Sequence, residues 1–146
     1  IYVVMNIGMF SCIFLMKKDG KYTDQIKDLS GISKKHPILS LSFLIILFSL
    51  AGIPPLGGFF AKFYIFMAVI ENGMYTLAII GLLSTVISAF YYLKIIKIIY
   101  FDELEKPLDE VKNFNIISTI LLSCIILITF FLYPSFLNNI VNFIFI

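Results

Sequence analysis

A single lysine interrupts a long apolar stretch of this chain. Lys62 is the only charged residue between Pro37 and Ile70. About 20 apolar residues are enough to cross a bilayer as a helix, and a charge at mid-membrane costs about 3 kcal/mol on insertion scales. Charged residues in such positions usually face protein or water and carry function. The sequence therefore predicts a membrane helix bundle with Lys62 as its candidate functional residue.

Composition supports the membrane class. Hydrophobic residues make up 60% of the 146 residues, aromatic residues 16%, and the mean hydropathy is +1.01. A soluble globular domain has a much lower apolar fraction. The net charge of +2 is the small difference between clustered lysines and clustered carboxylates, and it gives no reason to expect binding to nucleic acid.

The apolar segments predict an all-α, polytopic membrane protein with about five transmembrane helices, one of them broken, in a single membrane domain. The predicted spans cover residues 1–16, 37–53, 54–70, 74–100 and 114–133. A polar loop (17–36) and an acidic loop (101–113) separate them, and the tail 135–146 has the spacing of a short interfacial helix. Five alternating spans would place loop 17–36 and loop 101–113 on opposite faces of the membrane.

Prolines and glycines precede Lys62 and predict a broken helix. Pro54, Pro55, Gly57 and Gly58 can interrupt helical hydrogen bonding at the start of segment 54–70. Free backbone groups are tolerated at membrane depth only where they are buried or line a cavity. An ionisable group beside an interrupted membrane helix is typical of an ion or proton pathway.

Two interpretations of Lys62 follow. In the first, its ammonium snorkels to the headgroups, since it lies eight residues after Pro54, or about 12 Å of helix. In the second, it is buried and carries protons. Desolvation favours the neutral form of a lysine, so a buried lysine can exchange a proton near neutral pH, whereas an arginine keeps its charge.

Segment 74–100 carries a candidate proton path. Ser84, Ser88 and Tyr91 follow helical spacing and could form a polar stripe beside Lys62, and Thr85, Tyr92 and Lys94 lie close to them in sequence. The alternative is ordinary hydrogen bonding between helices. Snorkelling to headgroups is the preferred interpretation of Lys94 and Lys97.

The remaining polar and sulfur-containing residues are assigned structural roles. Cys12 and Cys124 stand far apart in apolar segments, without metal-ligand spacing, so they are predicted to be packing residues. No cofactor, metal or redox centre is expected on this chain. His36, next to Pro37 at the start of a helix, is interpreted as an interfacial residue, and Glu71 as a solvated one.

Three motifs stand out along the chain: Asp28-Leu29-Ser30-Gly31, Lys35-His36-Pro37-Ile38-Leu39 and Ser49-Leu50-Ala51-Gly52-Ile53-Pro54-Pro55-Leu56-Gly57-Gly58-Phe59-Phe60-Ala61-Lys62-Phe63-Tyr64. Together they resemble the antiporter-like subunits of respiratory complex I, and the Lys62-Phe63-Tyr64 ending is most similar to the branch called subunit 2, or subunit N in bacteria. The resemblance spans about residues 1–133. It implies a family fold of fourteen core helices with two inverted five-helix repeats, of which this chain is similar to the last five.

The resemblance also implies a function. Lys62 would be the proton-channel lysine of a membrane-arm subunit that takes part in proton translocation coupled to NADH:ubiquinone oxidoreduction, as a subunit of that enzyme without redox chemistry of its own. Its partners would be other membrane-arm subunits, membrane lipids, and a separate chain or an amino-terminal part that supplies the first-repeat helices. A multisubunit cation/proton antiporter and a structural remnant without transport are the alternatives.

Localisation and orientation rest on different signals. All eleven basic residues are lysine, a bias typical of AT-rich organellar or endosymbiont genes, which favours the mitochondrial inner membrane over the bacterial one. Lysine counting places loop 17–36, with six lysines, on the cytoplasmic or matrix side. The resemblance implies the opposite side, and we take that topology as the expectation because assembly into a larger complex can override the lysine rule.

Overall fold

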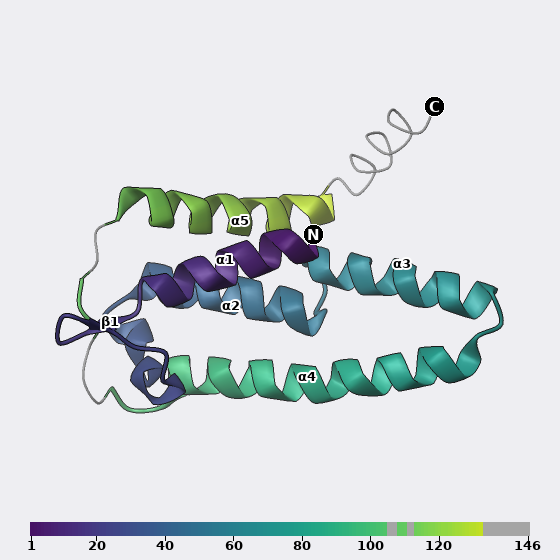
Figure 1. Ribbon diagram of the computed structural model, residues 1–146, viewed down its shortest axis with the longest axis horizontal. Helices are drawn as coiled ribbons and strands as arrows, with labels where there is room; N and C mark the ends of the chain where they lie inside the picture. The colour runs from purple at the N-terminus through teal and green to yellow at the C-terminus, as the bar shows by residue number, and fades with distance from the viewer. Residues whose placement is uncertain (105–107, 111–112, 133–146) are drawn as a thin grey trace.

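The computed structural model describes residues 1–104, 108–110 and 113–132. Figure 1 shows long helices that run roughly parallel to one another, with a small polar unit at one end. The α-helices are α1 (Tyr2–Phe14), α2 (Pro37–Ala51), α3 (Gly57–Glu71), α4 (Tyr75–Phe101) and α5 (Phe114–Leu132). The polar unit holds strands β1 (Lys17–Lys18) and β2 (Lys21–Tyr22) and two 3-10 turns, η1 (Ile26–Leu29) and η2 (Ile32–Lys34). The tail 135–146 lies outside the described residues.

The core forms around α2, which contacts α1, α4 and α5. Phe43, Ile46 and Leu47 of α2 have no exposed surface, and Cys12 of α1 and Cys124 of α5 are buried in the same cluster. Burying a large aliphatic or aromatic side chain contributes about 1.5–3 kcal/mol. The three helices α1, α2 and α5 therefore form the most tightly packed part of the described chain.

Helices α2 and α3 follow one another along α4 instead of folding back (Figure 1). Ile96 and Ile99, near the end of α4, belong to the core around α2. Nearer its start, Gly81 faces Phe66 of α3, where an added Cβ would come within 2.7 Å of the ring. At 1.5 Å per residue the 27 residues of α4 reach about 40 Å, enough to accompany both shorter helices. Segments 37–53 and 54–70 thus form two half-helices that follow the same direction, with a break between them.

The two long loops consequently lie at the same end of the bundle, and the prediction that they lie on opposite faces is wrong. The amide of Asp109 donates to the Lys17 carbonyl at 2.8 Å, and the Asp109 carboxylate accepts from the Gly20 amide at 2.8 Å. The Gly31 amide donates to the Ile98 carbonyl of α4 at 3.0 Å. The sequence prediction failed because it treated the helix break as a reversal of chain direction.

The polar loop contains regular structure that an all-α prediction omits. Strands β1 and β2 pair antiparallel, with Lys18 opposite Lys21. The two residues between them, Asp19 and Gly20, have φ values of 53° and 76°. Aspartate followed by glycine is favoured in two-residue hairpin turns because such turns need positive φ at both positions. The Asp-Gly pair was therefore a readable hairpin signal.

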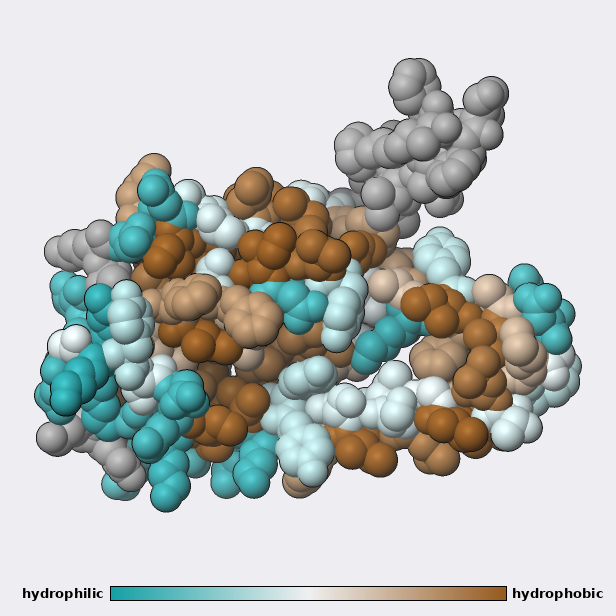
Figure 2. Space-filling view, in the orientation of Figure 1, coloured by the Kyte–Doolittle hydropathy of each residue, from teal (hydrophilic) through white to brown (hydrophobic). Residues whose placement is uncertain are grey.

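Surface hydropathy follows the pattern of a membrane protein. Figure 2 shows hydrophilic residues gathered at the polar unit and at the α3–α4 turn, with hydrophobic surface along the helices between them. By length and composition, one helix of the described chain, α4, can cross a membrane alone, and a second candidate joins the segment Ile26–Lys34 to α2 with a bend of 118°. Helix α1 and the described part of α5 are apolar but shorter.

Asp28 of the polar unit is held by Lys18 and Thr23 in an arrangement that we call the carboxylate clasp, and it gives a pH-dependent prediction. Hydrogen bonds from Lys18 and then from Thr23 lower the pKa of Asp28. A lowered pKa in the folded state means that the stabilisation is complete above the unfolded value of about 3.9 and is lost as pH falls through the folded value. Hydrogen exchange of β1–η1 amides should therefore accelerate in that acidic window.

The Asp28 prediction has a matched control. Asp28→Asn should remove most of this pH dependence and expose the same amides already at neutral pH. Asp24→Asn alters an exposed aspartate four residues away and should leave the exchange profile unchanged. Equal pH profiles for the wild type and Asp28→Asn would contradict the role given to the clasp.

A second prediction concerns the close approach of α3 to α2. A Cβ added to Gly58 would lie 1.8 Å from the Ser49 carbonyl oxygen, whereas one added to the adjacent Gly57 would meet only ordinary contacts at 3.4 Å and beyond. Overpacking costs about 1–3 kcal/mol or more, so Gly58→Ala should strongly reduce the amount of folded protein in membranes. Gly57→Ala, the control, should fold nearly normally. Equal membrane levels and thermal stability for the two variants would show that this close approach is not required.

Candidate functional site

The candidate site is the break between α2 and α3, and it begins with how α2 ends. Gly52 adopts a φ of 82°, and its amide donates to the Ser49 carbonyl at 3.0 Å. The Ile53 amide donates to the Phe48 carbonyl at 3.0 Å. These two bonds form a Schellman motif, in which a glycine stops the helix and its last turn is closed. The carbonyls of Leu50 and Ala51 do not take part in it.

Lys62 reaches back from α3 to those carbonyls. Its Nζ donates to the Leu50 carbonyl oxygen at 2.9 Å and to the Ala51 carbonyl oxygen at 3.3 Å. A cation at the carboxyl end of a helix contributes about 0.3–1 kcal/mol, and up to about 2 kcal/mol when it is partly buried. Lys62 is half-buried and lies against the backbone of Gly52, so it points into the break and not along α3 toward a headgroup region.

The start of α3 receives a reciprocal cap from α2. The first turn of a helix has unpaired amides, and Leu56, the residue that precedes α3, provides no side-chain hydrogen bond for them. Instead the Gly58 amide donates to Ser49 Oγ of α2 at 3.0 Å. The break is therefore closed from both sides, with Ser49 capping α3 and Lys62 capping α2.

The structure separates the four predicted helix-breaking residues into two groups. Pro54 and Pro55 lie in the non-helical segment between α2 and α3, joined by a cis peptide bond. Gly57 and Gly58 are helical and form the first turn of α3, so their assignment to the break itself is corrected. Gly58 is required there because a side chain at position 58 would collide with α2, whereas Gly57 has room for a Cβ.

Aromatic rings surround the start of α3. Phe59 stacks on Phe63, with ring centroids 5.9 Å apart, and meets Phe60 edge to face at 5.4 Å. Phe60 in turn contacts Phe130 of α5 at 6.1 Å. Aromatic pairs of this kind add about 0.5–1.5 kcal/mol beyond the area that they bury. They anchor the turn of α3 that carries Lys62 against α5.

The polar residues predicted on α4 stay separate from Lys62. Ser84 and Ser88 donate to carbonyls of their own helix, at Gly81 and Ser84, and Thr85 does the same at Leu82. Tyr91 and Lys94 are exposed, and Tyr92 packs against the core. Among the described residues no hydrogen bond joins this group to Lys62. The polar path along α4 thus stays a prediction.

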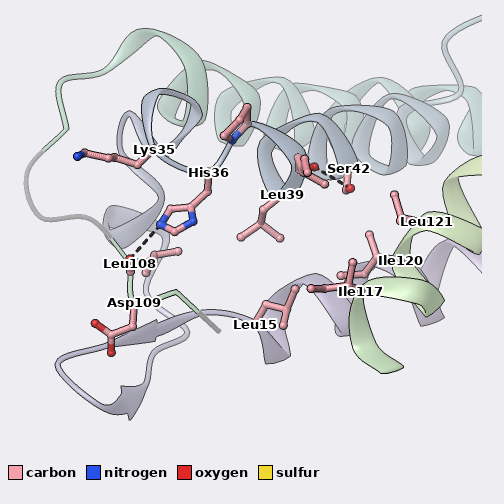
Figure 3. Close-up of a pocket in the computed structure, with 12 residues that line it drawn as sticks. Leu15, Lys35, His36, Leu39, Ser42, Leu108, Asp109, Ile117, Ile120 and Leu121 are labelled. Carbon is pink, nitrogen blue, oxygen red and sulfur yellow. Dashed lines mark hydrogen bonds between the residues drawn. The ribbon is translucent and has the colours of Figure 1, made fainter. Parts of the chain in front are cut away.

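Apart from the helix break, a pocket lies at the end of the bundle that carries the two long loops. It has a volume of about 260 Å³ and opens between the ends of α1, α2 and α5 (Figure 3). Its centre is lined by apolar side chains, while Lys35 and Asp109 extend away from it (Figure 3). His36 Nε2 donates to the Leu108 carbonyl at 2.9 Å and ties α2 to loop 101–113. Among the described residues no three potential metal ligands come together here or elsewhere.

Sequence reasoning missed Ser49 as a site residue. It noted Ser49 only as part of a motif. The signal was readable only together with the path of the chain, because the partner of Ser49 is a backbone amide that carries no sequence signature.

Comparisons with known proteins agree with the family resemblance that was drawn from the sequence motifs. A family model described as NADH:quinone oxidoreductase/Mrp antiporter, TM, matches residues 1–88. The chain is 58% identical over 142 residues to NADH-quinone oxidoreductase subunit N of Pelagibacter ubique, covering 97% of this chain and 30% of that protein. It is 45% identical over 135 residues to subunit N of Rhodospirillum rubrum, covering 92% and 28%. The predicted similarity to subunit N is confirmed.

A solved structure supports the fold. A chain in respiratory complex I from Thermus thermophilus with bound aureothin superposes with a TM-score of 0.80 and 24% sequence identity, over 92% of this chain and 30% of that chain. The chain spans about 30% of the length of these relatives. Because the family model covers more than half of the chain, the chain belongs to the NADH:quinone oxidoreductase/Mrp antiporter transmembrane family.

Proposed function

We propose that this chain is part of a membrane-arm subunit of proton-translocating NADH:quinone oxidoreductase, in which Lys62 accepts and releases a proton. The observation that carries the proposal is the position of Lys62 on the Leu50 and Ala51 carbonyls at a helix break. The relatives named subunit N favour this function over the antiporter branch of the same family. The enzyme activity belongs to the whole complex, and we assign no redox step and no cofactor to this chain.

The geometry gives a physical reason for choosing a lysine. While protonated, the ammonium completes the carboxyl end of α2 through charge and hydrogen bonds. After the proton leaves, the amine keeps weaker donors and loses its attraction to the helix dipole. The stability of the α2–α3 break therefore depends on the protonation state of Lys62. Such a dependence can link proton transfer to movement of one half-helix against the other.

We further propose four membrane crossings in place of the five expected from the sequence. Helices α1, α4 and α5 would each cross, and α2 with α3 would form one broken crossing beside α4. This arrangement puts Lys62 near the middle of the bilayer, since the break lies about halfway along α4 (Figure 1). Exposed apolar residues of α3 and α4, such as Ile65 and Val86, would then face lipids or neighbouring subunits.

The shared position of the two loops bears on orientation. The six lysines of loop 17–36 join Lys94 and Lys97, which precede the same end of α4, whereas the α3–α4 turn has no lysine. Lysines close to helix ends favour the cytoplasmic side. We propose that the loop end faces the cytoplasm or matrix, contrary to the expectation taken from the resemblance. The bacterial relatives favour a bacterial inner membrane over the mitochondrial one.

The first-repeat helices of the family would come from outside these 146 residues. A separate chain, as expected from the sequence, and another part of a longer polypeptide are both compatible with the 30% coverage of the relatives. In either case we propose that the open side of α3 and α4 receives those helices. The structural remnant without transport is the second candidate, and the reciprocal caps would serve it equally well.

Substitution of Lys62 distinguishes a proton carrier from a structural cation. Lys62→Ala should abolish most NADH-driven proton uptake per quinone reduced, in membranes matched for complex content. Lys62→Arg should restore little, because arginine keeps its proton. Lys97→Ala, an exposed lysine on α4, is the control and should pump normally. Full activity in Lys62→Arg, together with loss of assembly in Lys62→Ala, would instead identify a structural cation.

Purification distinguishes complex I from the antiporter branch. An affinity-tagged form of the natural protein, solubilised in mild detergent, should bring down flavin and iron–sulfur subunits and oxidise NADH with a quinone. A multisubunit antiporter would yield only membrane subunits. If the tagged protein were recovered in good yield but without flavin and without NADH oxidation, the complex I assignment would be removed.

A further inference from the structure

Ser49 lies where three helices meet. Its side chain is fully buried, and its hydroxyl makes two bonds in two directions. Ser49 Oγ donates to Met5 Sδ of α1 at 3.1 Å and accepts from the Gly58 amide of α3 at 3.0 Å. A single hydroxyl thus uses its donor and one acceptor site to connect α1, α2 and α3.

The bond to Gly58 sets the position of Lys62. Gly58 and Lys62 are four residues apart on α3 and therefore lie on the same face, one turn from each other. Ser49, Leu50 and Ala51 are consecutive residues of α2, so the acceptor of Gly58 adjoins the acceptors of Lys62. Any rotation or shift of α3 that breaks the Ser49–Gly58 bond also moves the ammonium relative to its two carbonyls.

The alternatives for capping α3 are poor at this place. Leu56 offers no side-chain acceptor, and the segment before it contains only Ile53, Pro54 and Pro55. Water would have to enter a contact in which even a Cβ on Gly58 has no room. Without the Ser49 hydroxyl, the Gly58 amide would be left unpaired in a buried position.

We propose that Ser49 is a positioning residue for proton transfer by Lys62. Its hydroxyl fixes the first turn of α3 against α2 and so holds the Lys62 ammonium on the carbonyls of Leu50 and Ala51. Ser49 itself neither takes up nor releases the proton. This inference rests on the proposed function, since it concerns the same lysine, but it assigns a role to a residue that was not among the candidate proton-transfer residues.

The experiment compares three serine variants in membranes that hold the complete complex. Ser49→Ala removes both hydroxyl bonds, and Ser49→Thr keeps a hydroxyl. Ser40→Ala removes an equally buried hydroxyl of α2, whose one bond among the described residues is to the carbonyl of His36, just before the same helix. The readouts are NADH-driven proton uptake per assembled complex and its dependence on pH. Lys62→Ala is measured in parallel.

We expect Ser49→Ala to slow proton uptake about tenfold, the factor that corresponds to about 1.4 kcal/mol in a barrier. The midpoint of its pH profile should move by about one pH unit, because one pH unit corresponds to a tenfold change in proton affinity. Ser49→Thr should recover most of the rate and the profile, and Ser40→Ala should match the wild type. A displaced pH profile is the informative result, because a loss of stability alone would reduce the amount of complex and leave the profile in place.

Three results would overturn the inference. One is a Ser49→Ala complex that pumps at the wild-type rate with the wild-type pH profile. Another is a Ser49→Ala variant that assembles poorly while each remaining complex pumps normally. The third is a Ser40→Ala variant with the same defect as Ser49→Ala. In each case a simultaneous loss of uptake in Lys62→Ala leaves the proposed function standing, whereas normal uptake in Lys62→Ala removes the proposed function itself.

Discussion

The structure depends on satisfying the backbone where α2 stops and α3 begins. Lipid offers no hydrogen bonds, so a carbonyl or amide freed at membrane depth needs a protein partner. Here the amides of the Schellman motif at Gly52 donate to two carbonyls of α2, and Lys62 donates to the next two. Ser49 accepts a hydrogen bond from the amide of Gly58. These partners pair the last carbonyls of α2 and one amide of the first turn of α3 within the protein, where the chain is interrupted between Gly52 and Leu56.

A break closed in this way leaves the direction of the chain unchanged. Because α3 continues beyond α2, a long helix, α4, is needed to return to the starting side, and its 27 residues run past both half-helices. The two long loops then meet at one end. There, backbone hydrogen bonds from Gly31 and Asp109 connect segments far apart in sequence, and Gly31 is required because a Cβ would lie 2.7 Å from the Leu104 amide.

The packed and the open parts of the molecule have different roles. Helices α1, α2 and α5 supply most of the buried residues, and they hold the carboxyl end of α2 in place. Helix α3 and the first half of α4 expose many apolar side chains. A tightly packed bundle on one side of the break and a lightly packed half-helix on the other would suit the proton transfer that we propose for Lys62.

The sequence by itself determined the class of the protein and the helical segments, and it singled out Lys62 as the candidate functional residue. Apolar runs of sufficient length, prolines and glycines at their ends, and one charge among them are local signals, and the structure has one α-helix at each predicted span, with somewhat different ends. The Asp19-Gly20 hairpin was also encoded locally, although it was overlooked.

Only the tertiary structure decided how these elements are joined. Periodicity does not say whether a helix break reverses the chain or continues it, so it could not show that the two loops lie together. It also could not pair Lys62 with two carbonyls or Ser49 with an amide, because backbone groups are the same at every position. Their selection depends on which helix end comes within about 3 Å, and that distance is set by packing across the whole bundle.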